Sequence, residues 1–377
     1  MHILVCPDSY KESLSAERAA QAMARGVRLA VPQAGIVCCP MADGGEGSLE
    51  ALMAATGAQR MQTQVQDALG RPVKATWGWL EAQRTAYIEL AEACGLQQLS
   101  LAERDALSTS TFGVGELLLA ALEEGAQNLL LLLGGSATND GGAGMLCALG
   151  ARLLDAQGQP LPAGGAALAQ LATLDLSGLD ARLANIRIEA AVDVDNPLLG
   201  PQGASATFGP QKGASPEQVE QLDQALAQLA DVTAQTLGSD KRDLPGAGAA
   251  GGMGFAAHVF LKATLRPGIE LIMDQAGMSH HLAWADLVMT GEGRLDGQSM
   301  AGKAPIGVAR AAHQAGKPVI VLAGCLGDGW QAAYQHGVTA AFALVEGPTT
   351  LADAMAHTDA LLETRCESLL RLWAARP

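Results

Sequence analysis

The sequence predicts an α/β fold with two α/β domains, and three observations carry this prediction. The chain has 377 residues, which is more than one small domain needs. Near both ends, short apolar runs alternate with helical patterns, as in a parallel sheet whose faces are covered by helices. The 45 glycines follow no collagen-like period, so we expect many turns that bring the backbone close to other backbone or to a ligand.

The two ends of the chain are expected to form one domain, residues 1–60 together with 280–377. Residues 2–6 form a continuous apolar run that predicts a buried strand. A helical pattern follows over residues 16–30, and Ser9 with Glu12 matches a capping box ahead of it. The remaining elements of this domain are four strands at residues 36–39, 287–289, 319–322 and 341–345, and one closing amphipathic helix at residues 351–375.

The middle of the chain, residues 61–279, is expected to be an inserted domain with a mixed sheet. Residues 61–90 show the short, polar-interrupted runs of an antiparallel ribbon. The elements predicted after it are helices at 111–124 and 143–149 and strands at 129–133 and 186–192, with a Gly-rich loop after the first of these strands. The active site is then expected in the cleft between the two domains.

Composition excludes several classes of function. Hydrophobic residues make up 49% of the chain, which excludes a disordered protein. The 24 basic and 39 acidic residues give a net charge of −15, which opposes nucleic acid or an anionic membrane surface as a partner. The seven cysteines show no CxxC spacing and are expected to be buried thiols.

The protein is expected to be soluble and cytoplasmic. At the N-terminus only residues 3–6 are continuously apolar, which is far shorter than the core of a signal peptide. No stretch reaches the roughly 18 apolar residues that a membrane-spanning helix requires. The sequence leaves the oligomeric state open.

A Gly-rich loop between a buried strand and a helix, residues 134–142, is the first candidate for phosphate binding. Glycines let successive backbone N–H groups face an anion, and the next helix contributes its N-terminus. The alternative is a tight turn at a sheet edge, which we consider insufficient for so many glycines. The residues predicted to bind ATP here are Gly134, Gly135, Ser136, Asn139, Asp140, Gly141 and Gly142.

A second candidate follows the strand at residues 287–289. Gly297, Gly302 and Lys303 come close to a Walker A motif, but Ala304 stands where that motif has the magnesium-binding hydroxyl. A P-loop is therefore excluded, although Lys303 is still predicted to bind ATP phosphates. The alternative is a solvated charged loop, which the well-placed Pro305 of the next helix disfavours.

Two further segments follow strands of the first domain at their carboxyl ends, where open α/β sheets bind ligands. Their predicted substrate-binding and catalytic residues are Asp8, Ser9, Lys11, Asp43, Gly44, Gly45 and Glu46. The alternatives are a helix or turn cap for Asp8 and a simple Asp-Gly-Gly turn at Asp43.

Asp193 and Asp195 follow the strand at 186–192. If the strand continues through them, both side chains lie on one face and form either a proton acceptor or a magnesium site. The alternative is an Asx turn before Pro197. The GAGAAG segment at 246–251 is not taken as a dinucleotide fingerprint because no buried strand precedes it. Zinc-binding spacings and a GxSxG elbow are absent.

Taken in order, six segments resemble the bacterial glycerate kinase family: DSYKESLSA, PMADGGEGS, GGSATNDGGAGM, GAGAAGGMG, TGEGRLDGQS and GKAPIGVA. The match spans nearly the whole chain, and it departs from the family at Tyr10 and Glu12, where Phe and Gly are usual. The resemblance implies ATP and magnesium (Mg²⁺) as cofactors, D-glycerate as the acceptor, and phosphorylation at O2 to give 2-phosphoglycerate. It also implies two α/β domains with a discontinuous first domain.

Phosphoryl transfer requires cations and a base. The cations next to the motifs are Lys11, Arg71, Lys212, Arg294 and Lys303, of which Arg71 and Arg294 are predicted to bind substrate and Lys11 to be catalytic. Asp193 is our first choice for the base and Asp8 the second, and Asp195 is the predicted metal ligand. Two alternatives remain: an NAD(P)-dependent oxidoreductase acting on a small hydroxy acid, and a nucleotide sensor without turnover.

Overall fold

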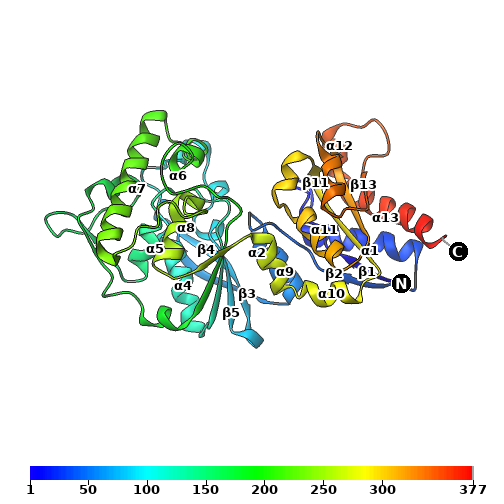
Figure 1. Ribbon diagram of the computed structural model, residues 1–377, viewed down its shortest axis with the longest axis horizontal. Coiled ribbons are helices and arrows are strands. Elements are labelled where there is room, and N and C mark those ends of the chain that lie inside the picture. The colour runs from blue at the N-terminus through cyan, green and yellow to red at the C-terminus, as the bar shows by residue number, and fades with distance from the viewer. Residues whose placement is uncertain (376–377) are drawn as a thin grey trace. The chain divides into compact units, whose positions relative to one another are not determined.

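The computed structural model describes residues 1–375 and divides them into two compact units, which we describe separately (Figure 1). Unit 1 consists of Met1–Asp43, Glu50–Gly57 and the described chain from Pro267 onward, and unit 2 of Gly44–Leu49 and Ala58–Arg266. The predicted α/β class with parallel sheets is confirmed. The predicted domain boundaries and the placement of the active site in a cleft between domains stay predictions.

Unit 1 is built on a five-stranded, fully parallel sheet in the order β13-β12-β11-β1-β2. Its strands are β1 (His2–Val5), β2 (Gly35–Cys38), β11 (Leu287–Leu295), β12 (Val319–Leu326) and β13 (Ala340–Ala343). Its helices are α1 (Ala16–Ala30), α9 (Gly268–Gln275), α10 (Met278–Trp284), α11 (Ala304–Gln314), α12 (Leu351–Ala356) and α13 (Thr358–Ala374), while α2 (Ser48–Thr56) begins in a segment of unit 2.

The connections of this sheet run in opposite directions from its centre. The chain moves from β1 through α1 to β2 on one side, and from β11 through α11 to β12 on the other. Because such crossovers are right-handed, α1 and α11 cover opposite faces. The carboxyl ends of β1 and β11 therefore meet at the point where the winding direction changes, which is where open α/β sheets bind ligands.

One face of the sheet is covered by α1 and α13, which lie side by side (Figure 1). Ile3 and Val5 of β1 are fully buried in the same core as Met23 of α1 and Leu362 of α13. The helices come this close because of Gly26, where an added Cβ would lie 2.2 Å from the carbonyl oxygen of Glu363.

The start of α1 differs from the predicted capping box. The N-cap is Ser15, whose hydroxyl accepts a hydrogen bond from the backbone N–H of Arg18 at 3.3 Å, so the assignment to Ser9 and Glu12 is wrong. Glu12 instead adopts the left-handed backbone conformation, with φ of 61°, which glycine adopts without strain. At Tyr10, the other position where the sequence differs from the motif it resembles, the hydroxyl donates to the carbonyl oxygen of Leu322 at 2.7 Å.

The C-terminal segment forms two helices rather than the single helix expected. The helix is interrupted at His357, which lies between α12 and α13. The hydroxyls of Ser13 and Thr358 both donate to the carbonyl oxygen of Met355, at 2.6 and 3.2 Å, in place of a continuing helix. Side-chain hydroxyls at a helix end compete with backbone N–H groups for the carbonyl oxygens. The spacing of apolar residues does not reveal this competition, so the sequence predicted one helix.

Unit 2 contains a six-stranded mixed sheet in the order β10-β9-β6-β5-β4-β3, as predicted for the middle of the chain. Its strands are β3 (Gln59–Gln66), β4 (Pro72–Leu80), β5 (Thr85–Glu89), β6 (Asn128–Leu132), β9 (Arg187–Ala191) and β10 (Thr264–Arg266), and β7 (Arg152–Leu154) pairs separately with β8 (Thr173–Asp175). Its helices are α3 (Ala91–Cys94), α4 (Phe112–Glu124), α5 (Ala143–Ala148), α6 (Ala204–Phe208), α7 (Pro216–Leu237) and α8 (Ala249–Val259).

The pairing within this sheet changes along it. β3, β4 and β5 form the expected antiparallel ribbon, and β5, β6, β9 and β10 run parallel. The leucines of β6 are buried on both faces, which is why this strand reads as an uninterrupted apolar run.

The cysteines only partly match the prediction. Cys6, Cys39, Cys94 and Cys366 are buried, whereas Cys38, Cys147 and Cys325 are exposed, because each of these three lies near the end of a strand or helix. Among the described residues, no helix combines the length and apolar character needed to cross a membrane.

Candidate functional site

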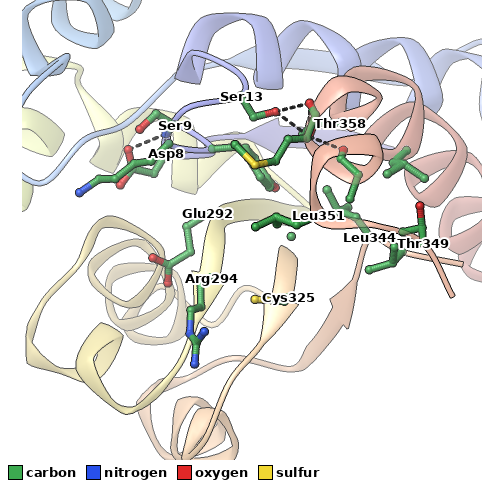
Figure 2. Close-up of a pocket in the computed structure, with 18 of the residues that line it drawn as sticks. Asp8, Ser9, Ser13, Glu292, Arg294, Cys325, Leu344, Thr349, Leu351 and Thr358 are labelled. Carbon is green, nitrogen blue, oxygen red and sulfur yellow. Dashed lines mark hydrogen bonds between the residues drawn. The ribbon is translucent and has the colours of Figure 1, made fainter. Parts of the chain in front are cut away.

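Unit 1 contains a cavity of about 670 Å³ at the carboxyl ends of β1, β11, β12 and β13 (Figure 2). It follows the strand ends because the loops that continue β1 and β11 diverge there, at the change in winding direction. The cavity brings together six residues predicted from the sequence: Asp8, Ser9, Lys11, Asp43, Arg294 and Lys303.

Asp8 is the buried acid of this cavity, with 9% of its surface exposed. Its backbone N–H donates to the carbonyl oxygen of Gly291, which fixes the loop beside β11. Its carboxylate accepts from the N–H of Ser9 at 2.5 Å. Burial, followed by the charge of Asp43, raises the pKa of Asp8 to about 7. A carboxylate with this pKa can accept and release a proton near neutral pH.

Glu292 was not among the predicted site residues, although the segment that contains it was singled out. It lies on β11, lines the cavity, and has only 5% of its surface exposed. One carboxylate oxygen, Oε1, is buried and has no hydrogen-bond partner among the described residues. Burial raises the pKa of Glu292, and the charge of Lys303 opposes that rise. A buried acceptor without a partner in a cavity is typical of a ligand site.

Three cations line the same cavity. Lys303 is the N-cap of α11, and its Nζ lies 3.8 Å from Oε2 of Glu292. Arg294 holds Asp296 through its Nε at 2.9 Å and keeps 63% of its side chain exposed. Lys11 follows β1 and is exposed. In a chain with a net charge of −15, this grouping of cations favours an anionic ligand.

The other end of the cavity is apolar. Figure 2 shows Leu344, Leu351 and Thr349 on the side opposite Asp8, Glu292 and Arg294. Leu351, the first residue of α12, has 77% of its surface exposed at this end. Further apolar lining residues were missed because no motif marks them: Val345, Pro348, Ala354, Met355 and Leu361.

The Gly-rich loop predicted to bind ATP lies in unit 2, between β6 and α5. Asp140 is fully buried, and its carboxylate accepts from the backbone N–H groups of Thr111, Gly142 and Gly144 at 2.8 to 3.1 Å. The hydroxyl of Thr111 accepts from the N–H of Met145 at 3.0 Å. The N-terminus of α5 is thus already occupied by side-chain oxygens of the protein itself.

The glycines of the loop have a packing role that the sequence did not reveal. Gly141 donates its N–H to the carbonyl oxygen of Gly251, in the GAGAAG segment, and an added Cβ at Gly251 would lie 2.0 Å from the carbonyl oxygen of Thr138. An added Cβ at Gly134 would lie 2.5 Å from Cα of Gly45. The GAGAAG segment follows a turn, as expected, and its glycines permit this close approach.

Lys212 is a buried lysine beneath the same loop. It is 2% exposed, and its Nζ donates to the hydroxyl of Ser136 at 2.7 Å and to the carbonyl oxygen of Thr138 at 2.6 Å. Burial lowers the pKa of Lys212 to about 8. Asn139 is also fully buried and donates to the hydroxyl of Ser205 at 2.9 Å.

Asp193 and Asp195 were expected to share one face only if the preceding strand continued through them, and it does not. β9 ends at Ala191, so the strand does not reach either residue. Both aspartates are exposed in the irregular segment that follows. Their predicted roles as base and metal ligand therefore stay predictions without support from strand geometry.

The remaining predicted residues also lie in unit 2. Arg71 donates to Asp67 and Glu103, at 2.6 Å each, so two carboxylates already neutralise its charge. Glu46 pairs with Gln97. Gly44 and Gly45 belong with Glu46 to the short segment of unit 2 that precedes α2.

Comparison with known proteins connects this site to one family. A model of the glycerate kinase family matches residues 3–374. The chain is 48% identical to a glycerate kinase of Bacillus subtilis (strain 168) over 363 residues, covering 96% of this chain and 95% of that protein. It is 49% identical to a glycerate 2-kinase of Escherichia coli (strain K12) over 354 residues, covering 94% of this chain and 93% of that protein.

The fold gives the same result. A crystal structure from Salmonella typhimurium LT2, assigned as a glycerate kinase 2, superposes with a TM-score of 0.90 at 47% sequence identity and covers 100% of this chain and 98% of its own. Nothing in these comparisons supports the oxidoreductase alternative. Since sequence and fold match end to end, this chain belongs to the glycerate kinase family and is a kinase.

Proposed function

We propose that this kinase transfers the γ-phosphoryl group of ATP to the O2 hydroxyl of D-glycerate and releases 2-phosphoglycerate and ADP. The observation that carries the proposal is the cavity of unit 1, where the buried carboxylate of Asp8 lies with three cations. Phosphoryl transfer depends on positioning and on neutralising spread charge, and such a cavity can supply both. The printed name of the Escherichia coli relative, glycerate 2-kinase, favours O2 as the acceptor.

Asp8 is our preferred base, ahead of Asp193. It accepts the proton of the O2 hydroxyl while the hydroxyl oxygen forms a bond to the γ-phosphorus. The bond from that phosphorus to the bridging oxygen breaks, and its electron pair leaves with ADP. The pKa of about 7 suits this step, because a base acts best when its pKa lies near the working pH.

The cations have distinct roles in this proposal. Arg294 binds the glycerate carboxylate, since a guanidinium can donate two parallel hydrogen bonds to a carboxylate. Ser9 and Asp43 contact the hydroxyls of the substrate. Lys303 and Lys11 neutralise the phosphates as point charges. Gly44, Gly45 and Glu46 stay candidates for substrate contact, and Arg71 becomes a weaker one because Asp67 and Glu103 already hold it.

Magnesium belongs to the proposal as the ion that neutralises the phosphates of ATP. Among the described residues, no group of three or more His, Cys, Asp or Glu could hold a metal ion. Mg²⁺ is often bound through one or two carboxylates together with substrate phosphates. Glu292 fits this need, because its Oε1 is buried without a partner in the described part of the chain. Glu292 would hold the ion, and Asp195 stays the alternative.

Thermal unfolding tests this function against the oxidoreductase. A ligand raises the unfolding temperature only of a fold that binds it. We expect Mg-ATP to raise the melting temperature and NAD or NADP to leave it unchanged. Protection by NAD without protection by Mg-ATP would contradict the proposal. We also propose a cytoplasmic location, which the seven unpaired thiols support because disulfides are rare in that compartment.

A further inference from the structure

The cavity of unit 1 is larger and less polar than glycerate requires. Its volume of about 670 Å³ is typical of sites for ligands of drug size. Glycerate is a three-carbon acid with two hydroxyls and no apolar face. It can use the end with Asp8, Arg294 and Lys303, but not the end with Leu344 and Leu351.

The apolar end has the features of a nucleoside site. Leu344 is buried at the end of β13, while Leu351 stands 77% exposed at the rim, where a flat base would cover it. Gly347 lies in the loop between them, and an added Cβ there would meet no atom within 4 Å, so the loop leaves room. The hydroxyl of Thr349 and the backbone of this loop offer polar partners for the edge of a base or a ribose.

The charged end of the cavity lies where the phosphates of a nucleotide bound at the apolar end would reach. Lys303 begins α11 with no side chain capping the helix, and Lys11 lies in the loop after β1. A triphosphate that extends from the apolar end toward Lys303 would bring its last phosphate to Asp8 and Glu292, which line the same end (Figure 2).

The Gly-rich loop of unit 2 is the competing nucleotide site, and its donors are largely used. Asp140 and Thr111 occupy the N-terminus of α5, and Gly141 is bonded to Gly251. The turn at residues 134–136 and the hydroxyl of Thr138, which has no hydrogen-bond partner among the described residues, remain for an anion. Neither of them lines the cavity of unit 1.

We propose that ATP binds in the cavity of unit 1, with its adenosine against Leu344, Leu351 and the loop between them, and its triphosphate directed to Lys303 and Lys11. This inference rests on the proposed function for the identity of the nucleotide. In this proposal the nucleotide does not bind at the Gly-rich loop. The glycines of that loop then serve to let segments of unit 2 pack closely together.

Leu351→Glu tests the inference, with Leu372→Glu as its matched control. Both leucines are exposed on helices of unit 1, at 77% and 73%, and only Leu351 lines the cavity. Leu351→Glu should raise the Kd of ATP, measured by calorimetry, at least tenfold and raise the KM for ATP, with the KM for glycerate unchanged. Leu372→Glu should change none of these values.

A second measurement uses Cys325, an exposed thiol that lines the cavity. Alkylation followed by peptide mass spectrometry should show that saturating ATP slows the modification of Cys325 at least tenfold. Cys38 and Cys147 are exposed outside the cavity and serve as internal controls whose rates should stay constant.

The outcomes separate this inference from the proposed function. An unchanged Kd of ATP in folded Leu351→Glu, or unchanged alkylation of Cys325 at saturating ATP, overturns the inference even if the enzyme phosphorylates glycerate. Absence of glycerate phosphorylation by the wild type overturns the function, while the binding and alkylation measurements still decide where ATP lies.

Discussion

The Nζ of Lys303 lies 3.8 Å from Oε2 of Glu292, so the cation that begins α11 faces the buried carboxylate of β11. This pair holds one positive charge at the cavity beside a carboxylate oxygen, Oε1, that has no partner among the described residues. In our proposal, a phosphate of ATP binds the cation and Mg²⁺ binds this carboxylate oxygen. The pair would then contact both charged parts of the Mg-ATP complex.

Lys303→Met tests the role of this cation. Loss of the ammonium should raise the KM for ATP roughly 10- to 150-fold, because a charge-assisted contact contributes about 1.5–3 kcal/mol. Lys317 does not line the cavity, so Lys317→Met is the control and should have the KM for ATP of the wild type. Ala304→Ser should bring no gain in magnesium affinity if Lys303 is not a Walker lysine. Wild-type kinetics in Lys303→Met would remove it from the site.

Asp8→Asn tests the base. The active form of Asp8 is the ionised one, so kcat/KM should rise with pH and level off above its pKa of about 7. The variant should lose roughly 10²–10⁴-fold in turnover together with this dependence. Asp43→Asn should move the acidic limb to lower pH, because the charge of Asp43 is the second cause of the raised pKa.

Asp193→Asn is the counterpart to Asp8→Asn, since each aspartate has been assigned the same role. We expect ordinary turnover and ordinary magnesium dependence in Asp193→Asn. If it loses turnover while Asp8→Asn retains it, the base lies in unit 2 and our assignment is wrong. A raised magnesium requirement in Asp193→Asn would instead identify a metal ligand.

Lys212 should make stability depend on pH. Its pKa is about 8 in the folded protein and 10.5 in an ordinary lysine, so between these values the unfolded chain binds more protons. The free energy of unfolding from this group therefore rises as pH rises through the window, by on the order of 3 kcal/mol in full. Lys212→Met should lose this rise, as measured by urea unfolding at pH 7.5 and 9.5. Parallel profiles of wild type and variant would contradict the account.

Gly142→Ala and Gly158→Ala separate packing from backbone strain. Both glycines have positive φ, 77° and 75°, so both variants carry similar strain. An added Cβ at Gly142 would lie 2.4 Å from Cβ of Ala256, and at Gly158 it would meet nothing within 4 Å. Gly142→Ala should be less stable than Gly158→Ala by about 1–3 kcal/mol in thermal unfolding. Equal stability, with weaker ATP binding in Gly142→Ala, would favour the phosphate-binding hypothesis for the loop.

Positive φ also affects the variant Gly135→Val as a test of phosphate binding by the loop. Gly135 also has positive φ, 73°, so a valine there would strain the backbone whether or not a phosphate binds. A loss of ATP affinity in Gly135→Val would therefore not by itself identify a phosphate contact.

The sequence predicted local features well and long-range ones poorly. Asp8 and Lys303 were identified because each follows a buried strand that apolar runs reveal. Their assembly in one cavity depends on the sheet order, in which β1 lies next to β11 although more than 280 residues separate them. No local pattern encodes that order.

Two features of the structure were missed for the same reason. The packing role of the glycines at 134–142 was missed because their close approach to Gly251 is a contact between distant segments. The apolar wall at Leu344 and Leu351 was missed because such residues are indistinguishable from core in a sequence. In contrast, the departure expected at position 12 coincides with a local backbone feature, since Glu12 adopts positive φ.

The most direct test of the account is the identity of the product. Purified protein is incubated with Mg-ATP and D-glycerate, and the phosphorylated acid is resolved by NMR or by coupled enzymes specific for each isomer. The account predicts 2-phosphoglycerate, formed with an equal amount of ADP and only when ATP is present. Formation of 3-phosphoglycerate, or no phosphorylated acid from a folded protein, would contradict it.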